Sequence, residues 1–337
     1  MNPQVSIVIP NYNGKHLLEK NLLSVLAAAG GFGSAEVIVV DDASSDGSVE
    51  WLNSVNCANL RICRLERNCG FAGACRAGAS EANGEIIYFL NTDIRTDADF
   101  LSHLVSHFND PNIFAVASMA YDGSGENIVS SRSGIKWKWG MPDVDRAARF
   151  DAPAASSSIT LFASGGHSAY RKSMFFDMGC FDSLYSPFYW EDVDLGYRAW
   201  KRGWKIVFEP KSVVYHDHQG TIGKIYRPRV LSIMRRNRFL FTWKNISDPT
   251  LLIRHVLALP FFLVIATLAG RRGVLSGFFM ALSSLPDVIS ARRKREREPL
   301  VLKDRDIFVL FDDAGYVSCP PRSDEAIYHQ KEKETNN

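Results

Sequence analysis

Two runs of apolar, β-favouring residues each end abruptly in acidic residues. The first is Glu36-Val-Ile-Val-Val-Asp41-Asp42, and the second is Glu85-Ile-Ile-Tyr-Phe-Leu-Asn91-Thr-Asp93. Both are typical of buried parallel strands, and open α/β sheets bind ligands at the carboxyl edge of such strands. Two acid-ended strands in one sheet therefore predict a site for a nucleotide and a divalent metal. The competing interpretation of either run alone is a buried strand that simply leaves the core for solvent.

Strand and helix patterns alternate along the first third of the chain, which predicts an α/β fold with a mostly parallel, doubly wound sheet and helices on both faces. We expect Gly30 and Gly31 to close the first helix. Two further strands are expected at 205–208 and 213–216. The earlier strands are expected at 5–10, 37–40, 60–65, 86–90 and 114–119, and the helices at 17–29, 48–55, 71–82 and 97–108.

Residues 121–160 show no regular period, and Gly, Ser and Pro are scattered among Trp137, Trp139 and Met141. This pattern predicts a mobile loop, and one interpretation places it over the active site. A strand-like run at 306–311 interrupts an otherwise polar tail that we expect to be partly disordered.

The chain changes character beyond residue 220. Residues 219–247 contain seven basic residues and no acidic one, and 230–244 has the pattern of a basic amphipathic helix. Two apolar stretches follow at 255–270 and 273–289, each shorter than the roughly 20 residues that a spanning helix needs. Pro260 and Pro286 interrupt them. We expect helices that lie in the membrane interface or form a shallow re-entrant pair; the alternative is a helical subdomain that packs on the sheet or on another protomer.

Length and composition limit the size of the core and the number of domains. With 337 residues and 46% hydrophobic content, the chain is large enough for a sizeable core and two domains. Six cysteines without a CxxC pair predict reduced, structural thiols. The N-terminus lacks the pattern of a signal peptide, so we expect the catalytic part on the cytoplasmic side. We therefore divide the chain into a catalytic domain at 1–220, a membrane-associating helical region at 221–298 and a polar tail at 299–337.

Five motifs stand out along the chain. They are Val5-Ser-Ile-Val-Ile-Pro-Asn-Tyr-Asn-Gly14, Val39-Val-Asp-Asp-Ala-Ser-Ser-Asp-Gly-Ser48, Asn68-Cys-Gly-Phe-Ala-Gly73, Leu90-Asn-Thr-Asp93 and Glu191-Asp-Val-Asp-Leu195. In this order and spacing they resemble family 2 glycosyltransferases over about residues 3–220. The resemblance implies a GT-A fold, a nucleotide-diphosphate sugar donor and inversion of the anomeric centre. It is strongest to single-addition enzymes of bacterial surface-polysaccharide assembly, often called rhamnosyltransferases, which implies dTDP-rhamnose as donor and a lipid-linked saccharide acceptor at the inner membrane.

The resemblance assigns Asp93 as the main ligand of Mg²⁺ or Mn²⁺, which would stabilise the charge on the leaving diphosphate. Relatives often have Asp-x-Asp where this chain has Asn91-Thr92-Asp93. Asn91 offers an amide oxygen in place of a carboxylate, so we expect weaker metal binding. His216 matches a histidine that some relatives contribute to the metal; otherwise it is a loop histidine.

The resemblance assigns Asp42 to recognition of the nucleotide base, and Pro10 and Tyr12 would flank the ring of this base. Asp41 either belongs to this site or has a structural role. Arg76 either contacts phosphate or is a surface charge of a helix. Three residues of the third motif allow the backbone to approach the diphosphate, namely Asn68, Gly70 and Gly73.

Inversion in one displacement requires a base for the acceptor hydroxyl, and Asp192 matches it. Glu191 and Asp194 would make its surroundings acidic and raise a carboxyl pKa. In the alternative interpretation, these acidic residues only begin a helix and interact favourably with the helix dipole. Gly165 and Gly166 match a loop close to donor and acceptor. Trp190 is either a platform for the acceptor sugar or a buried aromatic residue.

Two other function classes share parts of this pattern. A processive polysaccharide synthase uses the same sheet, but this chain lacks a Gln-x-x-Arg-Trp motif and an array of long spanning helices. A non-catalytic nucleotide-binding protein is disfavoured by the joint presence of Asp42, Asp93 and Asp192. The basic segment favours an anionic membrane surface over nucleic acid as a partner, and a homo-oligomer stays open.

Overall fold

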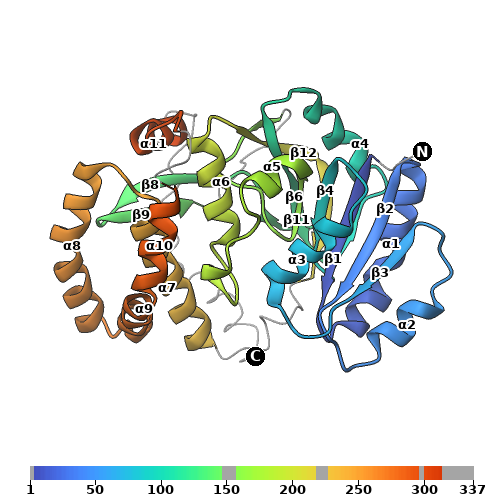
Figure 1. The fold of residues 1–337 in the computed structure, drawn as a ribbon, viewed down its shortest axis with the longest axis horizontal. Coiled ribbons are helices and arrows are strands. Elements are labelled where there is room, and N and C mark those ends of the chain that lie inside the picture. The colour runs from blue at the N-terminus through green and yellow to red at the C-terminus, as the bar shows by residue number, and fades with distance from the viewer. Residues whose placement is uncertain (1–3, 146–156, 218–226, 296–299, 313–337) are drawn as a thin grey trace.

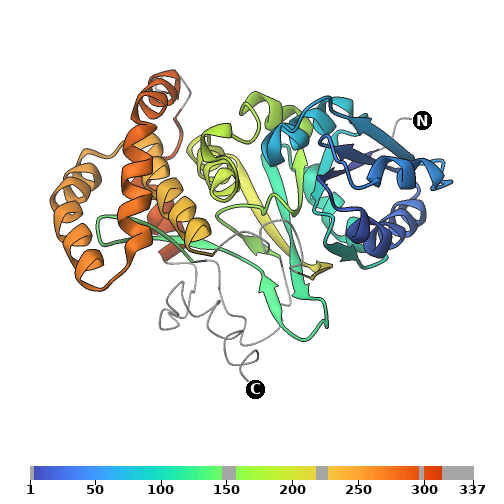
Figure 2. The same cartoon turned by 90° about the horizontal axis from the view of Figure 1, so that it is seen from below.

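The computed structural model describes residues 4–145, 157–217, 227–295 and 300–312. A sheet covered by helices forms one side of the molecule, and a group of helices from the C-terminal third forms the other (Figure 1). The perpendicular view keeps the two parts side by side (Figure 2). The predicted α/β fold with a C-terminal helical region is confirmed.

The large sheet consists of two parallel parts joined by one reversed strand. β11 (His167–Arg171) runs antiparallel to β4 on one side and to β6 on the other. The first parallel part has the order β3 (Leu60–Arg64), β2 (Ala35–Asp41), β1 (Val5–Asn11) and β4 (Ile86–Leu90). The second pairs β6 (Ile113–Asp122) with β12 (Lys205–His216), and three short strands add to it antiparallel: β5 (Ile94–Thr96), β7 (Ile128–Ser130) and β10 (Ser158–Ile159).

Alternating side chains of the central strands enter two separate cores, as the period of two in a strand requires. Val8 belongs to the core beneath α3 (Gly70–Glu81), whereas Ile7 belongs to the core beneath α1 (Lys15–Phe32). Gly78 allows α3 to lie close to the sheet, because a Cβ there would come within 2.3 Å of Val8 Cγ1. The other helices around the sheet are α2 (Ser48–Ser54), α4 (Phe100–Val105), η1 (Ser106–Asn109), α5 (Lys172–Asp177), η2 (Ser183–Tyr185) and α6 (Glu191–Lys201).

Several predicted boundaries were wrong. α1 continues through Gly30 and Gly31 and ends at Phe32; Gly33, the next residue, has a φ of +78° that provides the left-handed termination. The two strands expected at 205–208 and 213–216 form the single strand β12, with an irregularity between Glu209 and Val213. The cysteines of the described residues are free thiols.

The run at 306–311 is not a strand but part of α11 (Asp304–Asp312). Its buried residues Ile307 and Phe311 are four positions apart, which is the spacing of one helix face. Phe311 packs edge-on against Trp200 of α6. Short apolar runs fit either period, so packing decided this element. Residues 313–337 of the predicted tail lie outside the described part.

The prediction of a loop over 121–160 was also wrong for the described residues 121–145 and 157–160. Besides β7 and β10, this region forms the antiparallel hairpin of β8 (Gly134–Lys138) and β9 (Met141–Asp145). Figure 1 shows the hairpin reaching from the sheet toward α8. Its tip is fixed there, since the Gly140 carbonyl lies 2.8 Å from Nδ1 of His255. Residues 146–156 lie outside the described part.

Four helices form the C-terminal group: α7 (Arg227–Asn245), α8 (Pro249–Leu268), α9 (Arg272–Ser283) and α10 (Leu285–Arg295). α7 contains the predicted basic amphipathic segment, yet Phe239, Leu240 and Phe241 are buried in the protein core. α8 has 20 residues, so the expectation of a segment too short to span was wrong. Among the described residues, α8 is long and apolar enough to cross a membrane, and α9 with α10 passes the same criterion as a pair bent by 63°.

Candidate active site

The carboxyl ends of β1 and β2 are joined by Asp41. This buried carboxylate accepts hydrogen bonds from Asn11 Nδ2 (3.1 Å) and from the backbone N–H of Ser44 (3.1 Å). Asp41 therefore has the structural role that was one of its two interpretations.

Asp42 points to the beginning of α3. Its two oxygens accept the backbone N–H groups of Cys69 (2.6 Å) and Gly70 (2.9 Å), and Asn68 Oδ1 also accepts from Gly70 (3.1 Å). Burial and the neighbouring Asp41 raise the pKa of Asp42, against the lowering effect of the two N–H donors. Asp42 thus fixes the predicted diphosphate loop, and its contact with a base stays a prediction.

The remaining predicted nucleotide residues lie around this loop. Gly70 has a φ of +71°, which favours glycine. A Cβ on Gly73 would come within 2.5 Å of Cys69 Cβ, so a side chain there would displace the loop. Tyr12 at the end of β1 is 43% exposed and Pro10 beside it is half-buried. Arg76 lies on the exposed surface of α3.

The structure brings Asp93 and His216 together. His216 is opposite Ile94 in the β5–β12 pair, and its Nε2 atom lies 3.2 Å from Oδ2 of the buried Asp93. One carboxylate and one imidazole suit a divalent ion whose other ligands are water and diphosphate oxygens. No group of three or more His, Cys, Asp or Glu side chains with metal-binding geometry occurs within the described ranges. These residues fit a weakly held ion completed by the substrate.

Asn91 is in close contact with the Gly165–Gly166 loop. Its backbone N–H donates to the Gly166 carbonyl (2.8 Å), and a Cβ on Gly166 would lie 2.5 Å from Asn91 Nδ2. The backbone at Gly165 approaches Phe71 of α3 so closely that a Cβ would lie 3.1 Å from the ring. This loop therefore connects the predicted metal edge with the predicted diphosphate loop.

Glu191 and Asp192 begin α6 after a sharp turn. Tyr189 (φ 69°) and Trp190 (φ 78°) are both in the left-handed region, which costs a non-glycine residue energy and occurs often at functional sites. Asp192 is half-buried, and its Oδ1 accepts the N–H of Val193 (2.8 Å). Trp190 is buried against Phe241 of α7, with ring centroids 5.2 Å apart, so it is the buried aromatic residue and not an open sugar platform.

Asp194 does not make this turn acidic, contrary to expectation. It is fully buried and its carboxylate lies 2.8 Å from Arg198 Nε, 2.9 Å from Lys244 Nζ and 3.3 Å from Arg295 Nη2. Burial alone would raise the pKa of Asp194, but Arg295, Lys244 and Arg198 outweigh it and hold the pKa well below its ordinary value. Asp194 is an anchor between α6, α7 and α10.

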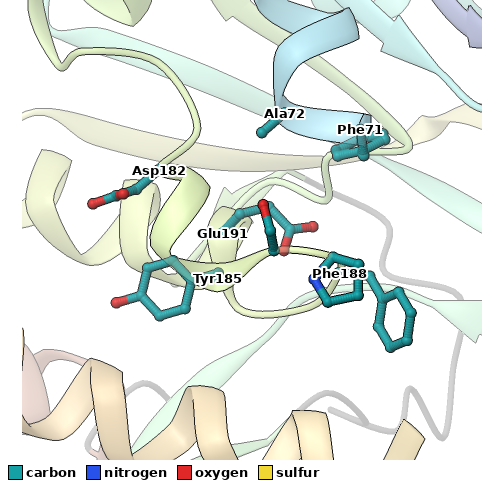
Figure 3. A pocket seen from close by; sticks show the side chains of 8 residues that line it. Phe71, Ala72, Asp182, Tyr185, Phe188 and Glu191 are labelled. Atoms are coloured by element: carbon teal, nitrogen blue, oxygen red, sulfur yellow. The ribbon is translucent and has the colours of Figure 1, made fainter. Parts of the chain in front are cut away.

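A small pocket separates the beginning of α3 from the turn before α6. Figure 3 shows Phe71 and Ala72 on one side facing Glu191 and Phe188 on the other. Phe71 lies inside the motif that ends at Gly73, so the sequence held a signal for it. Asp182 and Tyr185, by contrast, are in no motif that the sequence singled out. The lining residues are Phe71, Ala72, Asp182, Tyr185, Ser186, Pro187, Phe188 and Glu191.

Comparison with known proteins agrees with this geometry. The family model for "Glycosyl transferase family 2" matches residues 6–178. A poly-beta-1,6-N-acetyl-D-glucosamine synthase of Staphylococcus aureus is 24% identical over 231 residues, which are 67% of this chain and 53% of the synthase. The chain thus spans about half the length of such curated relatives.

Two solved structures share the fold. TarS 1-349 of S. aureus in complex with UDP-GlcNAc gives a TM-score of 0.56 at 18% identity, covering 88% of this chain and 82% of the TarS 1-349 chain. The mannosyltransferase PcManGT of Pyrobaculum calidifontis, in complex with GDP-Man and Mn²⁺, gives a TM-score of 0.53 at 16% identity, covering 89% and 82%. The predicted GT-A fold is confirmed.

Proposed function

The chain belongs to glycosyl transferase family 2, and on this premise we propose that it transfers one sugar from a nucleotide-diphosphate sugar to a lipid-linked saccharide, with inversion, in cell-surface polysaccharide synthesis. One observation carries the proposal. The carboxyl edge of a single sheet presents Asp42 and the Asp93–His216 pair. The Gly165–Gly166 loop and Phe71 connect this edge to the turn that presents Asp192.

Asp192 accepts the proton of the acceptor hydroxyl as that oxygen attacks the anomeric carbon and the bond to the diphosphate breaks. The nucleoside diphosphate leaves from the opposite face, which inverts the centre. Asp93 and His216, with the amide oxygen of Asn91, would hold Mg²⁺ or Mn²⁺, which when bound neutralises charge on the leaving diphosphate. Asp42 keeps the loop at the start of α3 in place for the nucleotide.

Asp192→Asn tests the assignment of the base. Loss of a general base costs about 10²–10⁴ in rate, so transfer should fall by this factor while donor binding, followed by thermal shift, stays unchanged. Asp177→Asn is the matched control, because this exposed aspartate pairs only with Arg202 among the described contacts. Transfer by Asp192→Asn within twofold of the unaltered protein would reject the role.

The donor is proposed as dTDP-rhamnose on the motif resemblance. UDP-GlcNAc and GDP-Man, found with the structural neighbours, are the alternatives to test. A thermal-shift screen of these donors with and without Mn²⁺ should show one clear preference. Equal shifts for all three would contradict a specific donor site.

A processive polysaccharide synthase is the second candidate function, because a similar protein is named poly-beta-1,6-N-acetyl-D-glucosamine synthase. The two functions differ in their products. A single added sugar on a defined acceptor supports the first proposal, whereas a ladder of products supports a synthase.

We also propose that α8 meets the cytoplasmic face of an anionic membrane. Its exposed apolar residues recur every three or four positions and include Phe261 (72% exposed) and Leu268 (83%). At the hairpin tip that contacts α8, Trp139 is 65% exposed, and Trp is favoured at membrane interfaces. The full stripe comprises Ile253, Val256, Leu257, Phe261, Val264, Ile265 and Leu268.

Vesicle flotation tests this surface. The protein should float with vesicles that contain phosphatidylserine, and Phe261→Ser with Leu268→Ser should reduce the bound fraction. Thr267→Ser, also exposed on α8, is the control. A protein that stays unbound and forms a dimer dissociated by the same double change would identify a second copy as the cover.

A further inference from the structure

One helix of the C-terminal group holds the loop that precedes the candidate base. Asn237 of α7 is fully buried, and its Nδ2 donates to the carbonyls of Tyr185 (2.8 Å), Phe188 (3.0 Å) and Tyr189 (2.8 Å). Its Oδ1 has no hydrogen-bond partner within the described residues. The NH₂ group of Asn237 therefore makes the hydrogen bonds of this side chain within the described residues, and its two hydrogens are shared among three carbonyls.

The preceding residue extends the same contact. Nη2 of Arg236 donates to the carbonyls of Leu184 (2.6 Å) and Ser186 (2.9 Å). Two successive residues of α7 thus satisfy five carbonyls within residues 184–189. The carbonyls of Tyr185 and Phe188 are bound in buried surroundings, where a carbonyl needs a donor. The loop belongs to no strand that could supply one.

The loop needs such support because it ends in a strained turn. Tyr189 and Trp190 are in left-handed conformations that persist only where the surroundings enforce them. Asp192 comes two residues later, at the first turn of α6. We propose that Arg236 and Asn237 are positioning residues that set the orientation of Asp192, an inference that rests on the proposed transferase function.

α9 meets α7 at the same place. A Cβ on Gly277 would come within 2.7 Å of Arg235 Cβ and 2.8 Å of the Arg236 backbone nitrogen. At Gly273, four residues earlier, an added Cβ would make only ordinary contacts, 3.6 Å from Leu231 Cβ, so Gly277 is the position that allows the two backbones to lie close together. α9, which also contacts α8, is thereby packed directly behind the residues that hold the catalytic turn.

The test uses the full chain with Asn237→Leu, which keeps the size of the side chain and removes the donor. A small displacement of a catalytic group can cost about 10²-fold. We expect kcat to fall by about 10² while the KM for the donor stays within about twofold. Amide hydrogen exchange at 184–190 should become faster. Thr242→Val is the matched control, because this buried hydroxyl of α7 donates only to the Arg238 carbonyl of its own helix among the described contacts.

Two variants of Arg236 test the proposal even if Asn237→Leu does not fold. Arg236→Lys keeps a charged donor and should retain more of kcat than Arg236→Met. If the unaltered protein transfers sugar, Asp192→Asn does not, and Asn237→Leu keeps full kcat, the positioning role is refuted and the function stands. If no donor is turned over at all, the function fails, and unchanged exchange at 184–190 in Asn237→Leu and Arg236→Met would refute the positioning role independently. If Asn237→Leu does not fold, equal kcat for Arg236→Lys and Arg236→Met overturns it.

Discussion

Asp194→Asn should destabilise the protein strongly, although it removes only one charge. The carboxylate is completely buried and is the common partner of Arg198, Lys244 and Arg295 from three helices. It also accepts hydrogen bonds from Tyr185 Oη and Asn245 Nδ2, both at 2.8 Å. An asparagine would leave buried cations uncompensated and turn an NH₂ group toward other donors.

Removing one member of a buried ion pair costs about 3–5 kcal/mol. For 337 residues, an unfolding entropy of about 2.1 cal/mol/K per residue gives about 0.7 kcal/mol/K. The unfolding temperature should therefore fall by about 4–7 °C, as measured by calorimetry. In the control Asp177→Asn, the lost pair with Arg202 has a similar length (3.0 Å), but Asp177 is 67% exposed. Such a pair contributes about 0–1 kcal/mol, so the shift should not exceed about 1–2 °C.

The effect should also depend on pH. The pKa of Asp194 in the folded protein is held below the ordinary value of 3.8 by Arg295, Lys244 and Arg198, against the effect of burial. Its contribution is therefore fully present above the unfolded pKa and is lost as pH falls through the folded pKa. The difference between the two proteins should be constant from about pH 5 to 7 and shrink below about pH 4. A shift no larger than that of Asp177→Asn, or a difference that stays constant as the pH falls from about 5 to 2, would refute this account.

Four further outcomes are expected. Gly166→Ala should raise the Mn²⁺ concentration needed for half-maximal transfer, because its Cβ would lie 2.5 Å from Asn91 Nδ2; an unchanged Mn²⁺ curve would contradict it. Chelation by EDTA should abolish transfer and added Mn²⁺ should restore it, with Asp93→Asn insensitive to the addition. Gly277→Leu should lower the free energy of unfolding by about 1–3 kcal/mol through overpacking against α7, measured by urea titration. Gly30→Ala should instead raise it by about 0.5–1 kcal/mol, because the position is inside α1 with no atom within 4 Å of the added Cβ.

The sheet and its functional edge followed from the sequence because strand period and strand ends are local properties. Apolar runs that end at Asp41 and Asn91 fixed both the strands and the side of the sheet that carries the acids. The meeting of Asp93 with His216 was assigned by motif and not by pattern. It depends on the antiparallel pairing of β5 with β12, which joins segments more than one hundred residues apart.

The errors arose where tertiary packing chose between local alternatives. The sequence of 306–311 fits a strand, but the structure buries Ile307 and Phe311 on one face of a helix. The β8–β9 hairpin was hidden because its strands are short and its tip is stabilised by His255 of α8, far along the chain. Asp194 was grouped with Glu191 and Asp192 by proximity in sequence, whereas its partners Lys244 and Arg295 come from helices that no local pattern connects to α6.

The basic residues at 219–247 show that charge in a sequence can mislead when the direction of each side chain is unknown. Arg236 donates to the loop at 184–189, Arg238 to the hairpin at Pro142, and Lys244 pairs with Asp182 and Asp194. These side chains are paired inside the protein, so the attraction to an anionic bilayer that we propose does not rest on them. In the run that ends α10, Arg295 likewise turns inward to Asp194, whereas Arg293 and Lys294 are exposed. For the membrane contact that we propose, the exposed cations in the region of α8–α10 include Arg254, Arg271, Arg293 and Lys294.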